Sequence, residues 1–199
     1  MSTFLAPIHS WMFGKIQAQD ELTSELAALA VQKGWLTQAE AAAFQYEETR
    51  SLPEVVGGDI HGGLSALIEE AERRYAELAD RLLGGHDERL DDLKTAAYAF
   101  GQKHAAMPDS EPQACYQAIL DVLLDGMPCD GVNIVTDSSP EHFSWERRID
   151  VHGERWGALG RSVAEYNALR RQVMAGILAN TRYAVATSDD RHYTLVAQG

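Results

Sequence analysis

The sequence changes its hydrophobic period near residue 126, and this change constrains the fold more than any other feature. Over residues 64–82, apolar side chains recur every three or four positions, which is typical of an amphipathic helix. Phe143 and Trp145, followed by Ile149 and Val151, instead alternate with polar residues, as in a half-buried strand. The pattern therefore predicts an α+β fold, in which a layer of helices precedes a sheet.

Capping residues, prolines and glycine pairs mark the boundaries of the predicted elements. Helices are predicted over residues 7–34, with or without a break at Asp20, and over 37–50, 62–83, 90–104, 110–125 and 162–180. The segment 52–58 is predicted to be a loop. Strands are predicted over 132–136, 143–152, 183–187 and 192–197.

The order of these elements predicts the architecture. About five helices form an N-terminal layer, which packs on a C-terminal antiparallel sheet of two hairpins linked by a helix. The short connection at Gly84 and Gly85 predicts that the helices over 62–83 and 90–104 pack together as an antiparallel pair. We expect residues 1–199 to form a single α+β domain, mainly helical over 1–126 and hairpin-helix-hairpin over 127–199.

Charge and composition narrow the range of partners. The chain has a formal net charge of −13 and no cluster of Lys and Arg, so nucleic acid is not an expected partner. No apolar segment approaches the ~20 residues of a membrane span, and the start lacks the pattern of a secretory signal, so no membrane partner is expected. Two cysteines cannot form a disulfide framework, which favours a reducing compartment. We expect a soluble cytoplasmic protein.

Four candidate metal ligands lie at the ends of predicted elements, where side chains from distant segments commonly meet. They are His9, His61, Cys129 and His152. Neutral imidazoles and a thiolate suit zinc, iron or haem. The four lack the short spacings of a zinc motif, so the alternative for His9 and His61 is that each caps the start of a helix. His152 is predicted to project half exposed from the sheet edge, so that its replacement changes stability little.

We expect these residues to line a pocket between the helical layer and the first hairpin. Trp11 and Trp156 would form aromatic walls, and Arg148 would contact a bound cofactor. The expected ligand is a transition metal ion, a metal-containing cofactor such as haem, or a small aromatic molecule. The predicted function is therefore the binding of a small-molecule ligand.

Two other classes of function stay open. Cys129 could be a nucleophile with His152 or His9 as its base, which would make the protein a cysteine-dependent enzyme acting on a small molecule. Alternatively, the chain could be a protein-interaction module without a pocket. Elemental analysis and cysteine alkylation would separate these classes.

Two predictions concern the surface. The acidic run at residues 69–72, which includes Glu72, is predicted to be a solvated helix face paired with Arg73 and Arg74. The C-terminal hairpin over 183–198 would leave an open strand edge, which has to be protected or paired with a second copy of the chain. This edge favours a homodimer.

Overall fold

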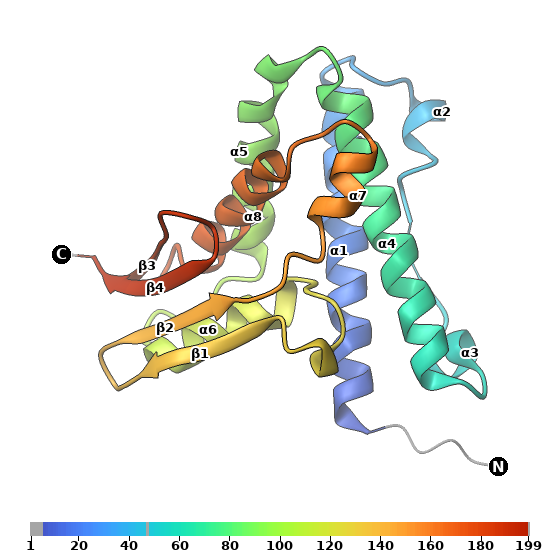
Figure 1. Cartoon of the computed structure of the whole chain (residues 1–199). Coiled ribbons are helices and arrows are strands. Elements are labelled where there is room, and N and C mark those ends of the chain that lie inside the picture. The colour runs from blue at the N-terminus through green and yellow to red at the C-terminus, as the bar shows by residue number, and fades with distance from the viewer. Residues whose placement is uncertain (1–5, 47, 199) are drawn as a thin grey trace.

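The computed structural model describes residues 6–46 and 48–198, and it has the predicted α+β fold (Figure 1). Within these residues, eight α-helices and two short 3-10 helices accompany a four-stranded antiparallel sheet. The α-helices are α1 (Pro7–Gln32), α2 (Gln38–Ala41), α3 (Leu52–Val56), α4 (Ile60–Leu83), α5 (Leu90–Lys103), α6 (Pro112–Val122), α7 (Gly153–Ala158) and α8 (Val163–Ile177). The 3-10 helices are η1 (Asp87–Arg89) and η2 (Pro128–Asp130), and the strands are β1 (Asn133–Ser138), β2 (Phe143–Arg147), β3 (Tyr183–Ala186) and β4 (His192–Ala197).

Helices α1 and α4 lie side by side and run in the same direction (Figure 1). Helix α1 continues through Asp20 without a break, and the buried Asp20 carboxylate pairs with Arg74 on α4 at 2.7 Å. From the end of α1 the chain reaches the start of α4 by way of α2 and α3. Pro53 in the first turn of α3 favours a short helix in place of the predicted loop. Both α2, which ends at Ala41, and α6 are shorter than predicted.

Helix α5 packs mainly on α8, and not on α4 as the sequence predicts. Glycines bring the two backbones into contact. A Cβ atom on Gly101 would lie 2.2 Å from the carbonyl oxygen of Val173, and a Cβ atom on Gly176 would lie 2.1 Å from that of Tyr98. The prediction is wrong because a short connection constrains only where α5 begins, whereas glycine pairs decide which helix can approach it most closely.

The sheet has the strand order β1-β2-β4-β3, so the two predicted hairpins join through β2 and β4. Phe143 lies opposite Leu195, and Trp145 lies opposite Tyr193, whose ring stacks on the indole with 5.2 Å between centroids. These four side chains are buried on the face that α6 and α8 cover. Alternate residues such as Ser144 point to the other face, as expected for an antiparallel sheet with one covered face.

Strand β2 ends at Arg147, earlier than predicted, and the unpredicted helix α7 follows it. Asp150 accounts for the change, because its Oδ1 accepts hydrogen bonds from the backbone N–H groups of His152 and Gly153, both at 3.0 Å. An aspartate that binds the backbone two and three residues later favours a turn and a helix start over a continuing strand. His152 therefore does not lie on the polar face of the sheet, where the sequence predicts it.

Two hydrophobic clusters fill the described part of the chain. The larger cluster extends from α1, α4 and α5 through α6 and α8 to the sheet, and the smaller one lies among α1, α3 and α4. The larger cluster thus contains residues of both the helical segment and the hairpin segment, and the assignment of one domain to the whole chain stays a prediction. None of the helices over residues 6–46 and 48–198 combines the length and the apolar character needed to cross a membrane.

Candidate functional site

Five buried polar side chains from distant segments meet in the interior, and we call them the buried polar cluster. Glu72 belongs to α4, Asp125 follows α6, His152 precedes α7, and Tyr166 and Arg170 belong to α8. Glu72, at 6%, is the most exposed of the five. Because buried ionisable groups are costly unless they are paired, and because such groups concentrate at functional sites, the cluster is a candidate site.

His152 lies at the centre of the cluster, between a carboxylate and a phenol. Its Nδ1 lies 2.8 Å from Oε2 of Glu72, and its Nε2 lies 2.7 Å from the hydroxyl oxygen of Tyr166. The imidazole and phenol rings also stack, with 3.9 Å between centroids. The carboxylate on one nitrogen orients the ring, and the other nitrogen can exchange a proton with the hydroxyl group, so this arrangement is suited to acid–base chemistry.

Arg170 neutralises Asp125 through a two-point contact. Its Nη1 and Nη2 donate to the two carboxylate oxygens at 2.5 and 2.8 Å, and Nδ2 of Asn133 donates to Oδ2 at 2.8 Å. Burial alone would raise the pKa of Asp125, but Arg170 and His152 hold that pKa well below its ordinary value. Removal of one partner from such a buried pair costs about 3–5 kcal/mol, since the other charge is left uncompensated.

Opposing effects set the charge of His152. Burial lowers the pKa of the imidazole, but the carboxylates of Glu72 and Asp125 raise it by more, so the pKa lies above its ordinary value. Burial also raises the pKa of Tyr166 well above its ordinary value, so the phenol stays protonated at neutral pH. The carboxylates of Glu72 and Asp125 therefore favour the protonated form of His152 in the folded protein.

The Glu72 and His152 side of the cluster borders a space of about 290 Å³, which we call the His152 cavity. Ile68, Met127 and Val151 contribute apolar walls. The other lining residues are Ser65, Glu69, Gly126, Asp130 and Arg155. Oε1 of Glu72 is buried and has no hydrogen-bond partner among the described residues. An unpaired buried oxygen costs free energy that a bound hydrogen-bond donor would restore.

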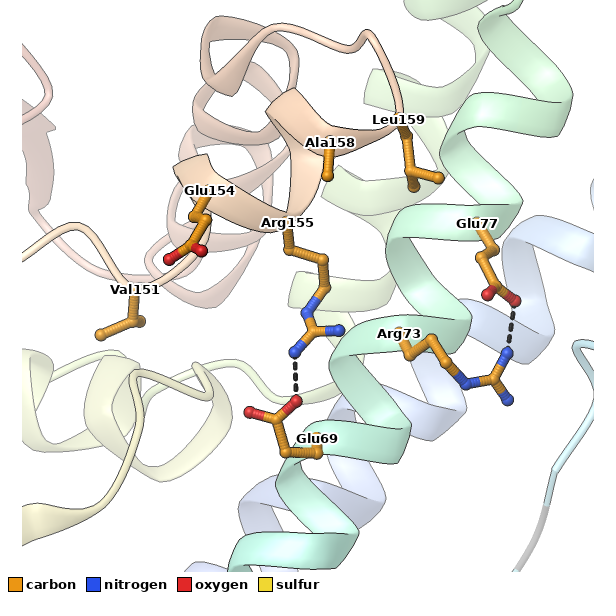
Figure 2. A pocket seen from close by; sticks show the side chains of 8 residues that line it. All are labelled: Glu69, Arg73, Glu77, Val151, Glu154, Arg155, Ala158 and Leu159. Carbon is orange, nitrogen blue, oxygen red and sulfur yellow. Dashed lines mark hydrogen bonds and ion pairs between the residues drawn. The ribbon is translucent and has the colours of Figure 1, made fainter.

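A wider groove of about 500 Å³ lies beside the His152 cavity, between α4 and α7 (Figure 2). Figure 2 shows Arg155 pointing from α7 toward Glu69 on α4, with which it forms an ion pair. Arg73 and Glu77 form a second ion pair at 2.5 Å along α4. These groups are partly or largely exposed and already satisfy one another, so they are not the strongest candidates for chemistry. Glu69, Val151 and Arg155 line both spaces, so the groove adjoins the His152 cavity.

Of the four predicted metal ligands, the structure places two histidines beside each other. The rings of His9 and His61 are 5.6 Å apart between centroids, in an edge-to-face arrangement. Nδ1 of His9 also accepts a hydrogen bond from the backbone N–H of Ala6 at 3.1 Å, as the capping alternative predicts. Over residues 6–46 and 48–198, no three His, Cys, Asp or Glu side chains are grouped so that they could hold a metal ion. The described chain does not assemble the expected four-residue ligand set.

The remaining predicted site residues lie in different environments. Cys129 is exposed in η2, and Arg148 is exposed just after β2. Trp156 is wholly buried in the larger hydrophobic cluster, which corrects its predicted place in a pocket wall. Trp11 lines another cavity, together with Lys15. None of these residues is among those that line the His152 cavity.

Glu72 is a functional candidate that the sequence prediction places wrongly. Instead of lying on a solvated face, it is buried against His152, whereas its neighbour Glu70 forms the predicted ion pair with Arg73 at 2.6 Å. The reason is helical geometry, because Glu72 lies one turn after Ile68, on the side of α4 that faces other elements. A carboxylate at that spacing within an apolar stripe is a signal for a buried partner.

Arg170 carries the same kind of signal. It lies four residues after Tyr166 and three before Val173, so it interrupts the apolar stripe of α8 with a guanidinium group. An arginine is rarely buried without a carboxylate or another acceptor, so this position indicates a partner. Asp125, which is the partner, stands 45 residues away in the chain and has no comparable pattern around it.

Comparisons of the chain with protein-family models, with curated proteins and with solved structures give no match. The function is therefore inferred from the geometry and chemistry of the site.

Proposed function

We propose that this protein binds a small molecule in the His152 cavity through a hydrogen-bond-donating or positively charged group. The observation that carries the proposal is the buried and unpartnered Oε1 of Glu72, whose other oxygen is held by His152. An N–H group of a ligand placed at this oxygen would satisfy it. A space that combines apolar walls with an unsatisfied polar group is typical of a small-molecule site.

The charges around the cavity support a ligand with a cationic group. Two of the three carboxylates that line the cavity are paired, Glu69 with Arg155 and Glu72 with His152. The third carboxylate, that of Asp130, therefore gives the lining a net negative charge. The apolar walls would contact the body of the ligand. Small aromatic amines and amidines combine these two properties, so they are the class that we propose.

Ligand-observed NMR with benzylamine and benzamidine, and with benzoate as their anionic counterpart, tests this proposal. We expect the two cations to bind and benzoate not to bind. Glu72→Gln should weaken cation binding by about tenfold or more, since a hydrogen bond to a charged group contributes ~1.5 kcal/mol or more.

Glu77→Gln is the matched control, because it makes the same change on the same helix outside the His152 cavity. It should bind the cations as the wild type does. Binding of benzoate alone, or cation binding that Glu72→Gln leaves unchanged, would contradict the proposal. Failure of all three compounds to bind would contradict it as well and would favour the protein-interaction module without a pocket.

A metal-containing ligand is a second proposal, which the paired imidazoles of His9 and His61 support. Two imidazoles supply half of the four ligands of a typical zinc site, and zinc, iron or haem would need its other ligands from elsewhere. Elemental analysis of the purified protein decides this proposal. A stoichiometric metal supports it, and a metal-free, fully folded protein removes it.

Cysteine chemistry is a third proposal, because the Cys129 thiol is exposed whereas Cys115 is buried, with a pKa that burial raises. His152 contacts Glu72 and Tyr166, so it would have to release one of them before it could serve as the base. With limiting alkylating reagent, Cys129 should react faster than Cys115, and equal labelling would remove Cys129 as a nucleophile. Free thiols at both positions support the cytoplasm as the compartment that we propose.

A further inference from the structure

Lys15 differs from the other three lysines of the chain. Lys33, Lys94 and Lys103 form surface ion pairs with Asp92, Asp91 and Glu25 respectively. Lys15 lies inside α1, is 4% exposed, and forms no ion pair or hydrogen bond with any other residue that the structure describes. Because lysine is almost never fully buried without a partner, this position needs a physical explanation.

The surroundings of Lys15 favour its neutral amine. Nζ lies 4.5 Å from the centre of the Trp11 ring system, a cation–π contact that favours the ammonium form and so opposes the effect of burial. Burial lowers the pKa of the amine, and although Asp125 opposes this change, Arg170 lowers the pKa further. Asp125 is already neutralised by Arg170, and Asp121, the other carboxylate that influences Lys15, accepts a hydrogen bond from Nε1 of Trp11 at 2.8 Å. Desolvated lysines of this kind are the ones that serve as nucleophiles.

Lys15 lines a cavity of about 170 Å³, which we call the Lys15 cavity. It adjoins the His152 cavity, because Gly126 and Met127 line both. Its apolar and aromatic lining includes Trp11, Tyr116, Leu120 and Val132. Asn133 also lines it, and Oδ1 of Asn133 is buried with no hydrogen-bond partner among the described residues, whereas Nδ2 donates to Asp125. A buried amine and an unused acceptor thus share one apolar cavity.

We propose that Lys15 forms an imine with a small, largely apolar aldehyde or ketone bound in the Lys15 cavity. The lone pair of the neutral amine attacks the carbonyl carbon, and one amine proton moves to the oxygen to give a carbinolamine. The C–O bond then breaks, and water leaves with the second amine proton, so that a C=N bond forms without any oxidant or reductant. Oδ1 of Asn133 would accept a hydrogen bond from the carbinolamine hydroxyl, and an aromatic carbonyl compound would pack on Trp11.

Reductive trapping with benzaldehyde and sodium cyanoborohydride tests the proposal in the unmodified protein. The hydride converts the imine into a stable benzylated lysine, which peptide mapping by mass spectrometry locates. At about pH 7 we expect Lys15 to be labelled on the order of tenfold faster than the three surface lysines, whose ammonium groups are held in ion pairs with carboxylates. The α-amino group, with an ordinary pKa of about 8, is expected to react as well and is resolved by the peptide map.

Two matched variants and a labelling measurement on the urea-unfolded protein serve as controls. Lys15→Met should lose the specific label, while Lys33→Met should keep it, although Lys33 also lies near an indole ring, that of Trp35. In urea the four lysines should react at similar rates, because the cavity no longer exists. If Lys15 in the folded wild type reacts no faster than Lys33, the proposal is overturned, and this outcome needs no variant. Because Glu72→Gln should leave Lys15 labelling intact, this proposal and the one for the His152 cavity can fail separately.

Discussion

At the scale of single residues, the burial of His152 determines how much this side chain contributes to stability. His152 is predicted to be half exposed, yet it is 1% exposed and is bound at both ring nitrogens. Replacement of a half-exposed histidine changes stability by about 0.5 kcal/mol, whereas removal of one member of a buried pair costs about 3–5 kcal/mol. His152→Ala should therefore unfold well below the wild-type temperature, which replaces the expectation of nearly unchanged stability, and a thermal unfolding measurement checks this.

The stability contributed by His152 should depend on pH. Its pKa in the folded chain lies above the ordinary value of 6.5, so folding favours the imidazolium form. This stabilisation is fully present below pH 6.5 and is lost as the pH rises through the folded value. Urea unfolding at about pH 6 and about pH 9 should show that the difference in unfolding free energy between wild type and His152→Gln is larger at the lower pH. A difference that grows with pH would mean that His152 is buried as the neutral imidazole.

At the scale of elements, the contact between α5 and α8 positions the site. Helix α8 carries Tyr166 and Arg170, so the approach of α8 to α5 helps to set where the buried polar cluster lies. The approach depends on Gly101 and Gly176, since a side chain at either position would meet backbone atoms of the other helix, which cannot rotate away. Helix propensity alone would favour alanine at both positions, so packing outweighs propensity here.

A pair of alanine substitutions tests this packing. In Gly176→Ala, the new Cβ would lie 2.1 Å from the carbonyl oxygen of Tyr98, so we expect a loss of about 1–3 kcal/mol or more in unfolding free energy. Gly14→Ala is the control, because a Cβ there meets no atom within 4 Å, and it should stabilise α1 by about 0.5–1 kcal/mol. Thermal and urea unfolding would measure both, and equal effects of the two substitutions would contradict close helix packing.

At the scale of the whole molecule, the sheet leaves two edges open among residues 6–46 and 48–198. Strand β4 lies between β2 and β3, so the C-terminal hairpin offers only the short strand β3 as an edge, and the other edge is β1. Ile134 and Val135 of β1 are 37% and 46% exposed, and the register is irregular between Val135 and Asp137. An exposed apolar edge strand favours pairing with another chain, which moves the expected dimer contact from the C-terminal hairpin to β1.

We therefore expect a homodimer in which β1 pairs with β1 of a second copy. Val135→Lys should yield a monomer, since a charged residue on an edge strand opposes pairing. Ala184→Lys, on the opposite edge strand β3, should leave the dimer intact. Light scattering at high micromolar concentration measures both variants. A wild type that is monomeric at that concentration would exclude the dimer, and dissociation by Ala184→Lys alone would place the contact at β3.

The sequence by itself determined most elements and the fold class, because the signals for these are local. Thr37 with Glu40, and Ser162 with Glu165, form the predicted capping boxes at the starts of α2 and α8. The period-two pattern of residues 143–145 and the polar turns correctly predict two hairpins, and the joined sheet follows from them. Asp150 before α7 is also a local signal, because its side chain binds the backbone at the start of that helix. The prediction does not use this signal, so it places the end of strand β2 too late.

Only the tertiary structure decided which ionisable groups are buried and which of them meet. His152 and Glu72 are 80 residues apart in the chain, and neither carries a local mark of the other. Whether a charged residue on a helix faces solvent or the interior depends on which element covers that face, and helix–helix contacts such as α5 with α8 decide this through close packing. The sequence could therefore indicate His152 as a candidate site residue, but the carboxylate and phenol that contact it, and the cavity beside it, exist only once the helices have packed.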